Sequence, residues 1–465
     1  MNVTVKFLGG TGTVTGSRYL LNIGKFRVLF DCGLFQGLKE LRLRNWDEFP
    51  IDPSSINAVV ISHAHIDHTG YLPRLVKEGF SGPIYCTEPT ADLMEIMLMD
   101  SAKLQEEEAS YAFSKGYSKH AAPQPLYTSM DAQSVFSLVK RHKYGSRIRI
   151  NNNVEIIFND AGHLLGSAIT EMYIQGETQT KKIVFSGDLG RSTDAMLNPP
   201  TEITDTDILF IESTYGNRSN TVVDPLEDLS RIVNEAMINN GVLLIPAFAV
   251  GRTQVLLYYL HQLIKEDRIP DVPVYIDSPM AISVTYLFYK YPEYHKVKFN
   301  SAVFAEEMET NMLVFVKNSQ HSKALNEIKS RAIIISSSGM MTGGRILHHL
   351  YHRLPNENDT VLISGYQAVG TRGRDLADGK PFIKIFGQAV PVKCKIANMS
   401  TLSGHADREE LFAWMKNFKD KPKITFTIHG EGDELKAYSN AIREKMNWNV
   451  MEPEYLKTIS LFEGI

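Results

Sequence analysis

The sequence contains few cysteines and no long apolar run. Cys32, Cys86 and Cys394 lie far apart in a chain of 465 residues, and no Cys-x-x-Cys spacing occurs. This argues against a disulfide framework and against a thiolate metal site, and it is typical of reduced thiols in a cytoplasmic protein. No apolar run approaches the roughly 20 residues that a membrane helix needs. The first residues alternate like a strand and lack the pattern of a signal peptide, so we expect a cytoplasmic protein without a membrane partner.

The chain also lacks a basic excess. Its formal net charge is −4, whereas proteins that bind nucleic acids usually carry positive charge. The basic residues that stand closest together are Lys140, Arg141, His142, Lys143, Arg147 and Arg149. Two interpretations of this stretch stay open, a basic groove for nucleic acid and a solvated face around a turn.

Length and periodicity indicate more than one unit. A chain of 465 residues exceeds one ordinary core, and 43% hydrophobic with 22% charged residues is typical of a globular protein. In the middle of the chain, helical segments alternate with short apolar runs such as Val242–Ile245, which is typical of a parallel α/β sheet. We therefore expect an α/β domain at 214–394, inserted between a first part at 1–213 and a C-terminal part at 395–465.

The strongest local signal follows the apolar strand predicted at 58–61. Here the sequence reads His63-Ala64-His65-Ile66-Asp67-His68. Imidazole and carboxylate groups suit zinc, and the absence of nearby cysteine argues for a catalytic rather than a structural site. The alternative is a polar loop with coincidental histidines, but four potential ligands within six residues seldom arise by chance.

Four further polar residues each stand at or just past the end of a predicted apolar strand. They are His163, Asp188, Glu212 and His429. Enzymes built on sheets gather their sites at such strand ends. Each residue alone is ordinary for a loop, and only their shared placement predicts a common site.

Together these motifs resemble the metallo-β-lactamase superfamily, and more narrowly the β-CASP nucleases, which carry an inserted second domain. The matching residues are Asp31, His63, His65, Asp67, His68, His163, Asp188, Glu212, His405 in Ser-Gly-His-Ala-Asp, and His429 in Ile-His-Gly-Glu. The resemblance covers nearly the whole chain. Within the group, the chain is similar to the endonuclease subunit of the cleavage and polyadenylation specificity factor and to its compact prokaryotic relatives. It implies an αββα sandwich with an inserted β-CASP α/β domain built on a parallel sheet.

The resemblance also implies the roles of the residues. Two zinc ions per chain are expected, with manganese as the alternative. One ion would take His63, His65 and His163, the other Asp67, His68 and His429, and Asp188 would bridge them. Asp67, Glu212 and His405 are the expected catalytic residues, with His405 as general acid oriented by Glu212. Asp31 would steady the metal-binding loop without being a ligand. For His405 the alternative is a histidine at a helix start, near Asp407.

Two segments of the expected inserted domain also resemble recurrent segments of these nucleases. They are Phe248–Arg252 and Gly365–Arg374. Glycine lets backbone N–H groups approach a phosphate, and arginine can bind one through two hydrogen bonds. We expect Arg252 and Arg374 to contact the substrate, with a structural role at a helix start or a surface turn as the alternative.

The function that the sequence favours is metal-dependent hydrolysis of phosphodiester bonds in single-stranded RNA, internally, from the 5′ end, or both. On family grounds, His429 favours RNA over DNA. A hydrolase of a small ester or thioester is the alternative, but it would leave Glu212, His405 and the insertion unexplained. A catalytically silent scaffold is disfavoured because no matched ligand is missing. A homodimer is compatible with the sequence.

Overall fold

The computed structural model divides the chain into two compact units. Unit 1 comprises Met1–Ser219 and His405–Ile465, and unit 2 comprises Asn220–Gly404. The structure describes residues 1–115, 123–219, 224–297, 313–365, 367, 370–399 and 402–464. Within these ranges, no helix is both long and apolar enough to cross a membrane. The three cysteines are buried and free.

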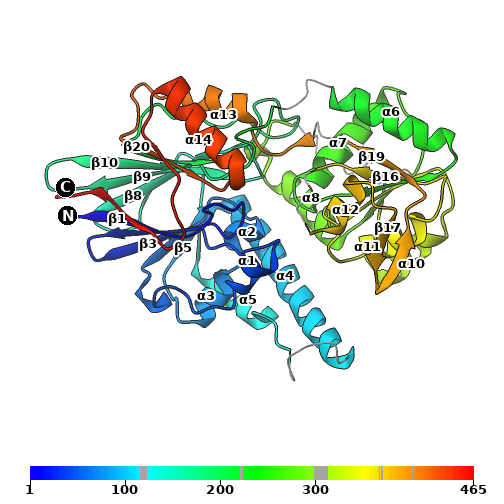
Figure 1. The fold of residues 1–465 in the computed structure, drawn as a ribbon, viewed down its shortest axis with the longest axis horizontal. Helices are drawn as coiled ribbons and strands as arrows, with labels where there is room; N and C mark the ends of the chain where they lie inside the picture. The colour runs from blue at the N-terminus through cyan, green and yellow to red at the C-terminus, as the bar shows by residue number, and fades with distance from the viewer. Residues whose placement is uncertain are drawn as a thin grey trace. The chain divides into compact units, whose positions relative to one another are not determined.

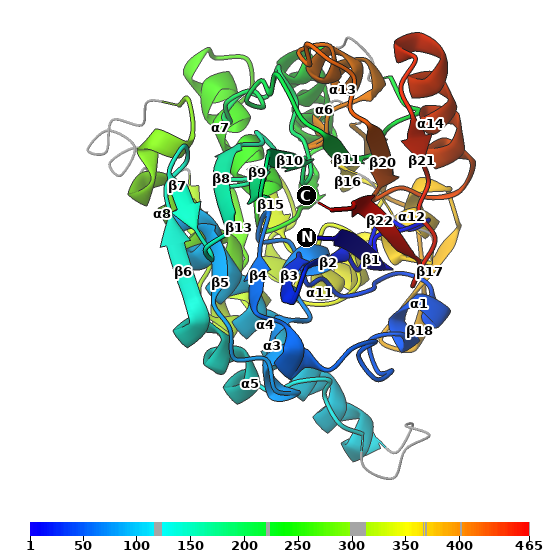
Figure 2. The same ribbon diagram turned by 90° about the vertical axis from the view of Figure 1, so that its left-hand side faces the viewer.

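Unit 1 is a sandwich of two seven-stranded sheets (Figures 1 and 2). The first sheet has the order β22 (Thr458–Phe462), β1 (Val3–Gly9), β2 (Arg18–Ile23), β3 (Phe26–Phe30), β4 (Ala58–Val60), β5 (Ile84–Thr87), β6 (Val139–His142). The second has the order β21 (Val450–Met451), β20 (Ile424–Ile428), β11 (Ile208–Glu212), β10 (Thr180–Phe185), β9 (Ala168–Gln175), β8 (Val154–Asp160), β7 (Arg147–Arg149). Buried side chains from both sheets form one core, in which the rings of Phe30 and Phe185 stack with centroids 3.7 Å apart.

Helices cover the outer face of each sheet, which completes the αββα arrangement expected from the sequence (Figure 2). The helices that the structure describes in unit 1 are α1 (Lys39–Leu43), α2 (Ile66–Thr69), α3 (Leu72–Lys77), α4 (Glu88–Lys115), α5 (Ser129–Val135), α13 (Arg408–Met415), α14 (Gly432–Met446) and the short 3-10 turns Pro53–Ser55 and Phe136–Leu138. Apolar side chains of α13 and α14 pack on the second sheet. α4 contacts β5 and β6 of the first.

Unit 2 is built on a six-stranded parallel sheet. Its order is β14 (Leu313–Phe315), β13 (Val274–Asp277), β15 (Ala332–Ser336), β12 (Val242–Pro246), β16 (Thr360–Ile363), β19 (Lys395–Asn398). The central strands β12 and β15 are buried along their whole length, as the apolar runs at 242–245 and 332–335 predict. Outside this sheet, β17 (Phe382–Ile385) and β18 (Gln388–Pro391) form a hairpin.

The helices of unit 2 connect and flank these strands. Those that the structure describes are α6 (Pro225–Ile238), α7 (Arg252–Lys265), α8 (Pro279–Lys290), α10 (Ser319–Ala324), α11 (Ile346–Arg353), α12 (Arg372–Ala377) and the 3-10 turns Pro292–Tyr294 and Leu325–Glu327.

One strand lies in a different unit from the one the sequence indicated. The expected boundary at 394 assigned β19 to the C-terminal part of the first unit, but β19 pairs in parallel with β16 in the sheet of unit 2. A strand of four residues carries no signal for its partner, because pairing is decided by packing against the whole sheet.

Candidate metal centre

Four of the expected ligands lie in the segment that follows β4. This segment passes close to the loop after β3, where the amide of Cys32 donates to the carbonyl of His68 at 2.7 Å. The contact requires glycine at position 33, because a Cβ there would meet the carbonyl oxygen of Asp67 at 1.6 Å. The two loops thereby hold His63 to His68 in a fixed backbone conformation at the edge of the sheet.

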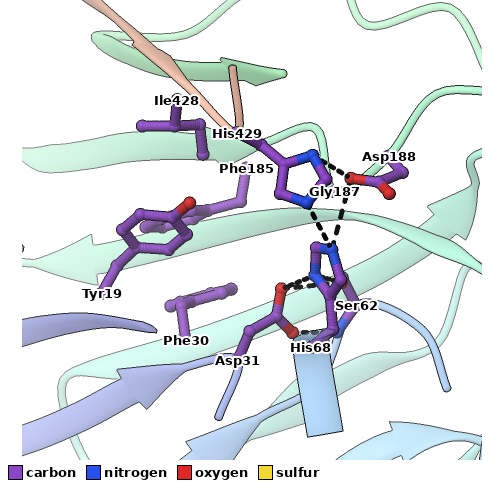
Figure 3. Close-up of a pocket in the computed structure, with 10 residues that line it drawn as sticks. All are labelled: Tyr19, Phe30, Asp31, Ser62, His68, Phe185, Gly187, Asp188, Ile428 and His429. Carbon is purple, nitrogen blue, oxygen red and sulfur yellow. Dashed lines mark hydrogen bonds and ion pairs between the residues drawn. The ribbon is translucent and has the colours of Figure 1, made fainter. Parts of the chain in front are cut away.

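The other expected ligands come from the second sheet. β10, β11 and β20 are parallel neighbours, so their carboxyl ends lie at one edge. Asp188 follows β10, Glu212 ends β11, and His429 follows β20. His163 comes from the loop between β8 and β9. All four are buried. Figure 3 shows the side chains of Asp188 and His429 pointing toward each other.

The structure brings these side chains together in two main groups that could hold metal ions. The first is His63, His65, His163 and Asp188, and the second is Asp67, His68 and His429, with the ligand atoms of each within 4.8 Å of one another. Asp188, Glu212 and His429 form a third, overlapping group.

The spacing of the ring nitrogens fits metal ions. His65 Nδ1 lies 3.1 Å from His63 Nε2 and 3.3 Å from His163 Nε2. In the second group, the Nε2 atoms of His68 and His429 are 3.2 Å apart. Two nitrogens at about 2.0–2.1 Å from a tetrahedral zinc would be about 3.3–3.4 Å apart. The donor set is therefore spaced as zinc ligands are, and imidazole with carboxylate is also acceptable to manganese.

Asp188 stands between the two groups. Its Oδ2 lies 3.6 Å from His63 Nε2 and 3.8 Å from His163 Nε2. Its Oδ1 lies 3.5 Å from His68 Nε2 and 3.4 Å from His429 Nδ1. This Oδ1 is buried and accepts no hydrogen bond from the described residues. A buried carboxylate oxygen is costly unless it is satisfied, and a cation on each side would satisfy both oxygens.

The charges of the cluster favour cations. Burial lowers the pKa values of His63 and His65, which keeps both rings neutral, as metal ligands must be. Burial also opposes charge on His68, but the carboxylates of Asp188, Asp31 and Asp67 outweigh it and raise the pKa of that ring well above its usual value. The field that would attract a proton there attracts a metal cation equally.

Asp31 supports this arrangement without belonging to any of the three groups. Its Oδ2 accepts a hydrogen bond from His68 Nδ1 at 2.7 Å, and its Oδ1 accepts one from the amide of Ser62 at 2.8 Å (Figure 3). The bond to Nδ1 fixes the ring of His68 so that Nε2 faces the cluster.

A further supporting residue, Thr214, was missed by the sequence analysis. Its hydroxyl lies 2.9 Å from His429 Nδ1, and it can donate to the carbonyl of His429 at 3.3 Å. It therefore accepts the Nδ1 hydrogen and leaves Nε2 of His429 free for the second group. Thr214 stands two residues after Glu212. Its closeness to this matched motif was the feature of the sequence that could have indicated a role in the site.

We expect Thr214→Val to weaken metal binding at the second group by about 10–100-fold, because the ring of His429 loses the partner that orients it. Valine preserves the branched shape of the side chain, so folding should be little affected. Titration of the metal-free protein with zinc against a chromogenic chelator would measure this. Equal affinities for variant and wild type would contradict the orienting role.

Glu212 and His405 meet beside the first group. His405 Nδ1 lies 3.3 Å from Glu212 Oε1. Glu212 is fully buried and is itself held by the amides of Leu189 at 2.7 Å and Thr214 at 3.2 Å. Burial alone would lower the pKa of His405, but the Glu212 carboxylate reverses the effect and raises this pKa to about 9. The ring also lies 4.4 Å from that of His163, at the border of the cluster.

His405 does not cap the helix that begins near it, which was the alternative role expected from the sequence. Asp407, not His405, caps α13: its carboxylate accepts the amides of Glu409 and Glu410 at 3.0 Å. Because Asp407 already caps the helix, the side chain of His405 is left for Glu212.

The predicted substrate residues lie in unit 2 and not in the metal cluster. Arg374 forms two bonds to Asp378, at 2.9 and 3.0 Å, which offset its charge. Arg252 begins α7 beside Gly365, where a Cβ would lie 3.7 Å from its guanidinium. A role of either arginine in substrate binding stays a prediction.

The basic stretch lies on β6 and β7, at one edge of each sheet. Arg141 pairs with Asp92, and Arg147 pairs with Glu155 at 2.9 Å. Charged residues on edge strands also prevent pairing with other chains. The structure therefore favours the solvated face over the nucleic-acid groove.

Comparisons with known proteins agree with this geometry. Three family models match the chain: a metallo-beta-lactamase superfamily domain over 20–213, a Beta-Casp domain over 253–376, and a Zn-dependent metallo-hydrolase RNA specificity domain over 389–453. Ribonuclease TTHA0252 of Thermus thermophilus is 34% identical over 441 residues, which cover 92% of this chain and 93% of the relative. The chain belongs to the β-CASP family of the metallo-β-lactamase superfamily.

Other β-CASP relatives match over similar lengths. An RNase J-like protein of Methanocaldococcus jannaschii is 31% identical, with 95% of each chain covered. Transcription termination factor FttA of the same organism is 29% identical, covering 98% of this chain and 71% of that protein. A crystal structure of a protein of unknown function from Enterococcus faecalis V583 has a TM-score of 0.55 at 14% identity and covers 99% of this chain and all of its own. The last likeness shows a shared fold alone.

Proposed function

We propose that this protein is a ribonuclease that hydrolyses phosphodiester bonds of single-stranded RNA with two metal ions, zinc or alternatively manganese. The observation that carries the proposal is the position of Asp188, with one carboxylate oxygen facing each group of ligands. Two ions held in this way fit hydrolysis of a phosphodiester, in which the attacking and the leaving oxygen both need stabilisation. The RNA specificity domain model and the ribonuclease relatives support RNA as the substrate.

The metal ions would supply a strong nucleophile from water near neutral pH and would offset negative charge on the phosphate. The remaining work falls to the protein. Burial keeps His63 and His65 neutral, and His163 lies with them in the first group of ligands. The carboxylates of Asp67 and Asp188 complete the two sites.

His405 then acts as the general acid. The contact with Glu212 occupies Nδ1, so the proton on Nε2 is the one available to the leaving ribose oxygen. Glu212 both orients the ring and stabilises its protonated form, while two backbone amides keep Glu212 in place. Asp67 is proposed to act as a ligand, because neighbouring histidines overcome burial and lower its pKa to about 2.

The test is cleavage of a single-stranded RNA labelled at the 5′ or the 3′ end, run beside a DNA strand of the same sequence with zinc or manganese added. We expect RNA fragments, and we expect no product from Asp67→Ala. Fragments of intermediate length would indicate internal cutting, and mononucleotides from the 5′ label would indicate an exonuclease. If metal-loaded wild type cuts neither polymer but hydrolyses a small ester or thioester, the proposal is wrong.

We propose a cytoplasmic location, as the sequence predicts. Three free, buried cysteines support a cytoplasmic protein. The homodimer stays a prediction.

A further inference from the structure

The hairpin of β17 and β18 in unit 2 turns through an unusual residue. Ile385 pairs with Gln388, so the loop consists of Phe386 and Gly387 alone. Both loop residues have positive φ, 49° and 82°, which defines a type I′ turn. Asparagine or glycine normally occupies the first position of this turn, because other side chains clash with the backbone there. Phenylalanine is therefore a poor choice for the turn itself.

Burial does not explain this phenylalanine either. The side chain is 53% exposed. Its ring lies against two other rings of the surface, that of His348 with centroids 4.7 Å apart and that of Tyr351 at 6.2 Å. Tyr351 is tied to the hairpin through its hydroxyl, which donates to Gln388 at 2.8 Å. We call His348, Tyr351 and Phe386 the aromatic cluster; it lies where α11 meets the hairpin (labels α11 and β17 in Figure 1).

Basic side chains stand near the aromatic cluster. Burial lowers the pKa of His348, which keeps this ring neutral, and the neighbouring His349, His352 and Lys323 lower it further. The negative group that acts on His348 is Asp277, which is fully buried.

Asp277 is already satisfied within unit 2. His349 Nε2 lies 2.7 Å and an Arg345 nitrogen 2.8 Å from its carboxylate. On the hairpin, Lys384 is exposed two residues before Phe386. In a chain of net charge −4, the aromatic cluster therefore presents flat rings near two lysines, Lys323 and Lys384. Rings beside cationic side chains are the combination that binds single-stranded nucleic acid through its bases and phosphates.

We propose that the aromatic cluster is a stacking platform for a base of the single-stranded RNA substrate, separate from the metal centre of unit 1. This inference rests on the proposed ribonuclease function. Phe386 supplies the exposed ring face, and Lys323 and Lys384 attract the adjacent phosphates. The proposed role also accounts for the strained positive φ of Phe386. A phenylalanine at the tip of the hairpin keeps its ring exposed to a base, at the cost of an unfavourable backbone conformation.

Phe386→Asn tests the proposal, because stability and RNA binding should respond differently. The Asn-Gly pair suits a type I′ turn, so the melting temperature should stay the same or rise. RNA binding should weaken, and we expect the KM of the metal-loaded enzyme on an RNA of about 20 nucleotides to rise about tenfold, with kcat within about twofold of wild type. Phe386→Trp should retain the wild-type KM.

A competition experiment separates stacking from charge. A DNA strand and an abasic strand of equal length are used as inhibitors of RNA cleavage. Phe386→Asn should weaken inhibition by the strand that has bases and leave inhibition by the abasic strand unchanged. Phe382→Thr is the matched control, since Phe382 is 57% exposed on the same hairpin and lies outside the aromatic cluster.

Several results would overturn the platform. They are a lower melting temperature for Phe386→Asn, an unchanged KM, an equal loss for Phe382→Thr, or a change in self-association by light scattering without a change in KM, which would indicate a protein partner. None of these results would affect RNA cleavage by the wild-type protein, so none would contradict the proposed function. A wild type that cuts no RNA would instead refute the proposed function.

Discussion

Replacing His405 by alanine is expected to slow RNA cleavage by about 10²–10⁴-fold without loss of metal. The reason is the contact with the fully buried Glu212, which holds the ring in place to protonate the leaving ribose oxygen. A leaving group that departs readily as an anion needs no proton. The same variant should therefore hydrolyse bis(p-nitrophenyl) phosphate within about tenfold of the wild-type rate.

Rates on the two substrates, with metal content measured on the same samples, would check this. Glu212→Gln should show the same dependence on the leaving group to a lesser degree, because a neutral amide orients the ring but stabilises its proton less. An equal loss on both substrates, or loss of metal from His405→Ala, would show that His405 acts as a ligand or a structural residue instead.

Replacing Asp188 by alanine is expected to release both metal ions and to reduce cleavage by more than about 10³-fold. One oxygen of this carboxylate faces each ligand group, so neither site remains complete. Asp67→Ala should release one ion only, because Asp67 belongs to the second group alone. The two variants thus differ in the number of ions that they retain.

Elemental analysis after dialysis would count the ions per chain, with two expected for wild type. Chelation should also lower the melting temperature of wild type but not of Asp188→Ala, since a metal at about 1,000 times its Kd stabilises a fold by about 4 kcal/mol. Asp205→Asn is the matched control, because this aspartate is 67% exposed and bonds to Lys182 away from the cluster. Two ions retained by Asp188→Ala would refute the bridging role.

Much of the site could be predicted because its parts are contiguous in the sequence or stand at strand ends. His63, His65, Asp67 and His68 lie within six residues, and His163 and Asp188 follow apolar strands that also form in the structure. The ends of parallel strands lie together at one edge of a sheet whatever the details of packing. The placement of these residues after apolar strands was therefore sufficient to predict a common site. The αββα arrangement and the inserted α/β unit followed from the same matches.

Other features depended on contacts between distant segments. Thr214 is 215 residues from His429, yet its hydroxyl lies 2.9 Å from that ring. β19 joined the sheet of unit 2 rather than the other unit.

The sequence by itself determined which groups could bind metal, because ligand chemistry belongs to the side chains and their spacing. Only the tertiary structure decided which of them share an ion and what each supporting group does. Asp188 faces two sets of histidines, and Phe386 occupies a strained, exposed turn, because of backbone paths through residues far away in the chain. Such relations arise from packing, which no local pattern of residues encodes.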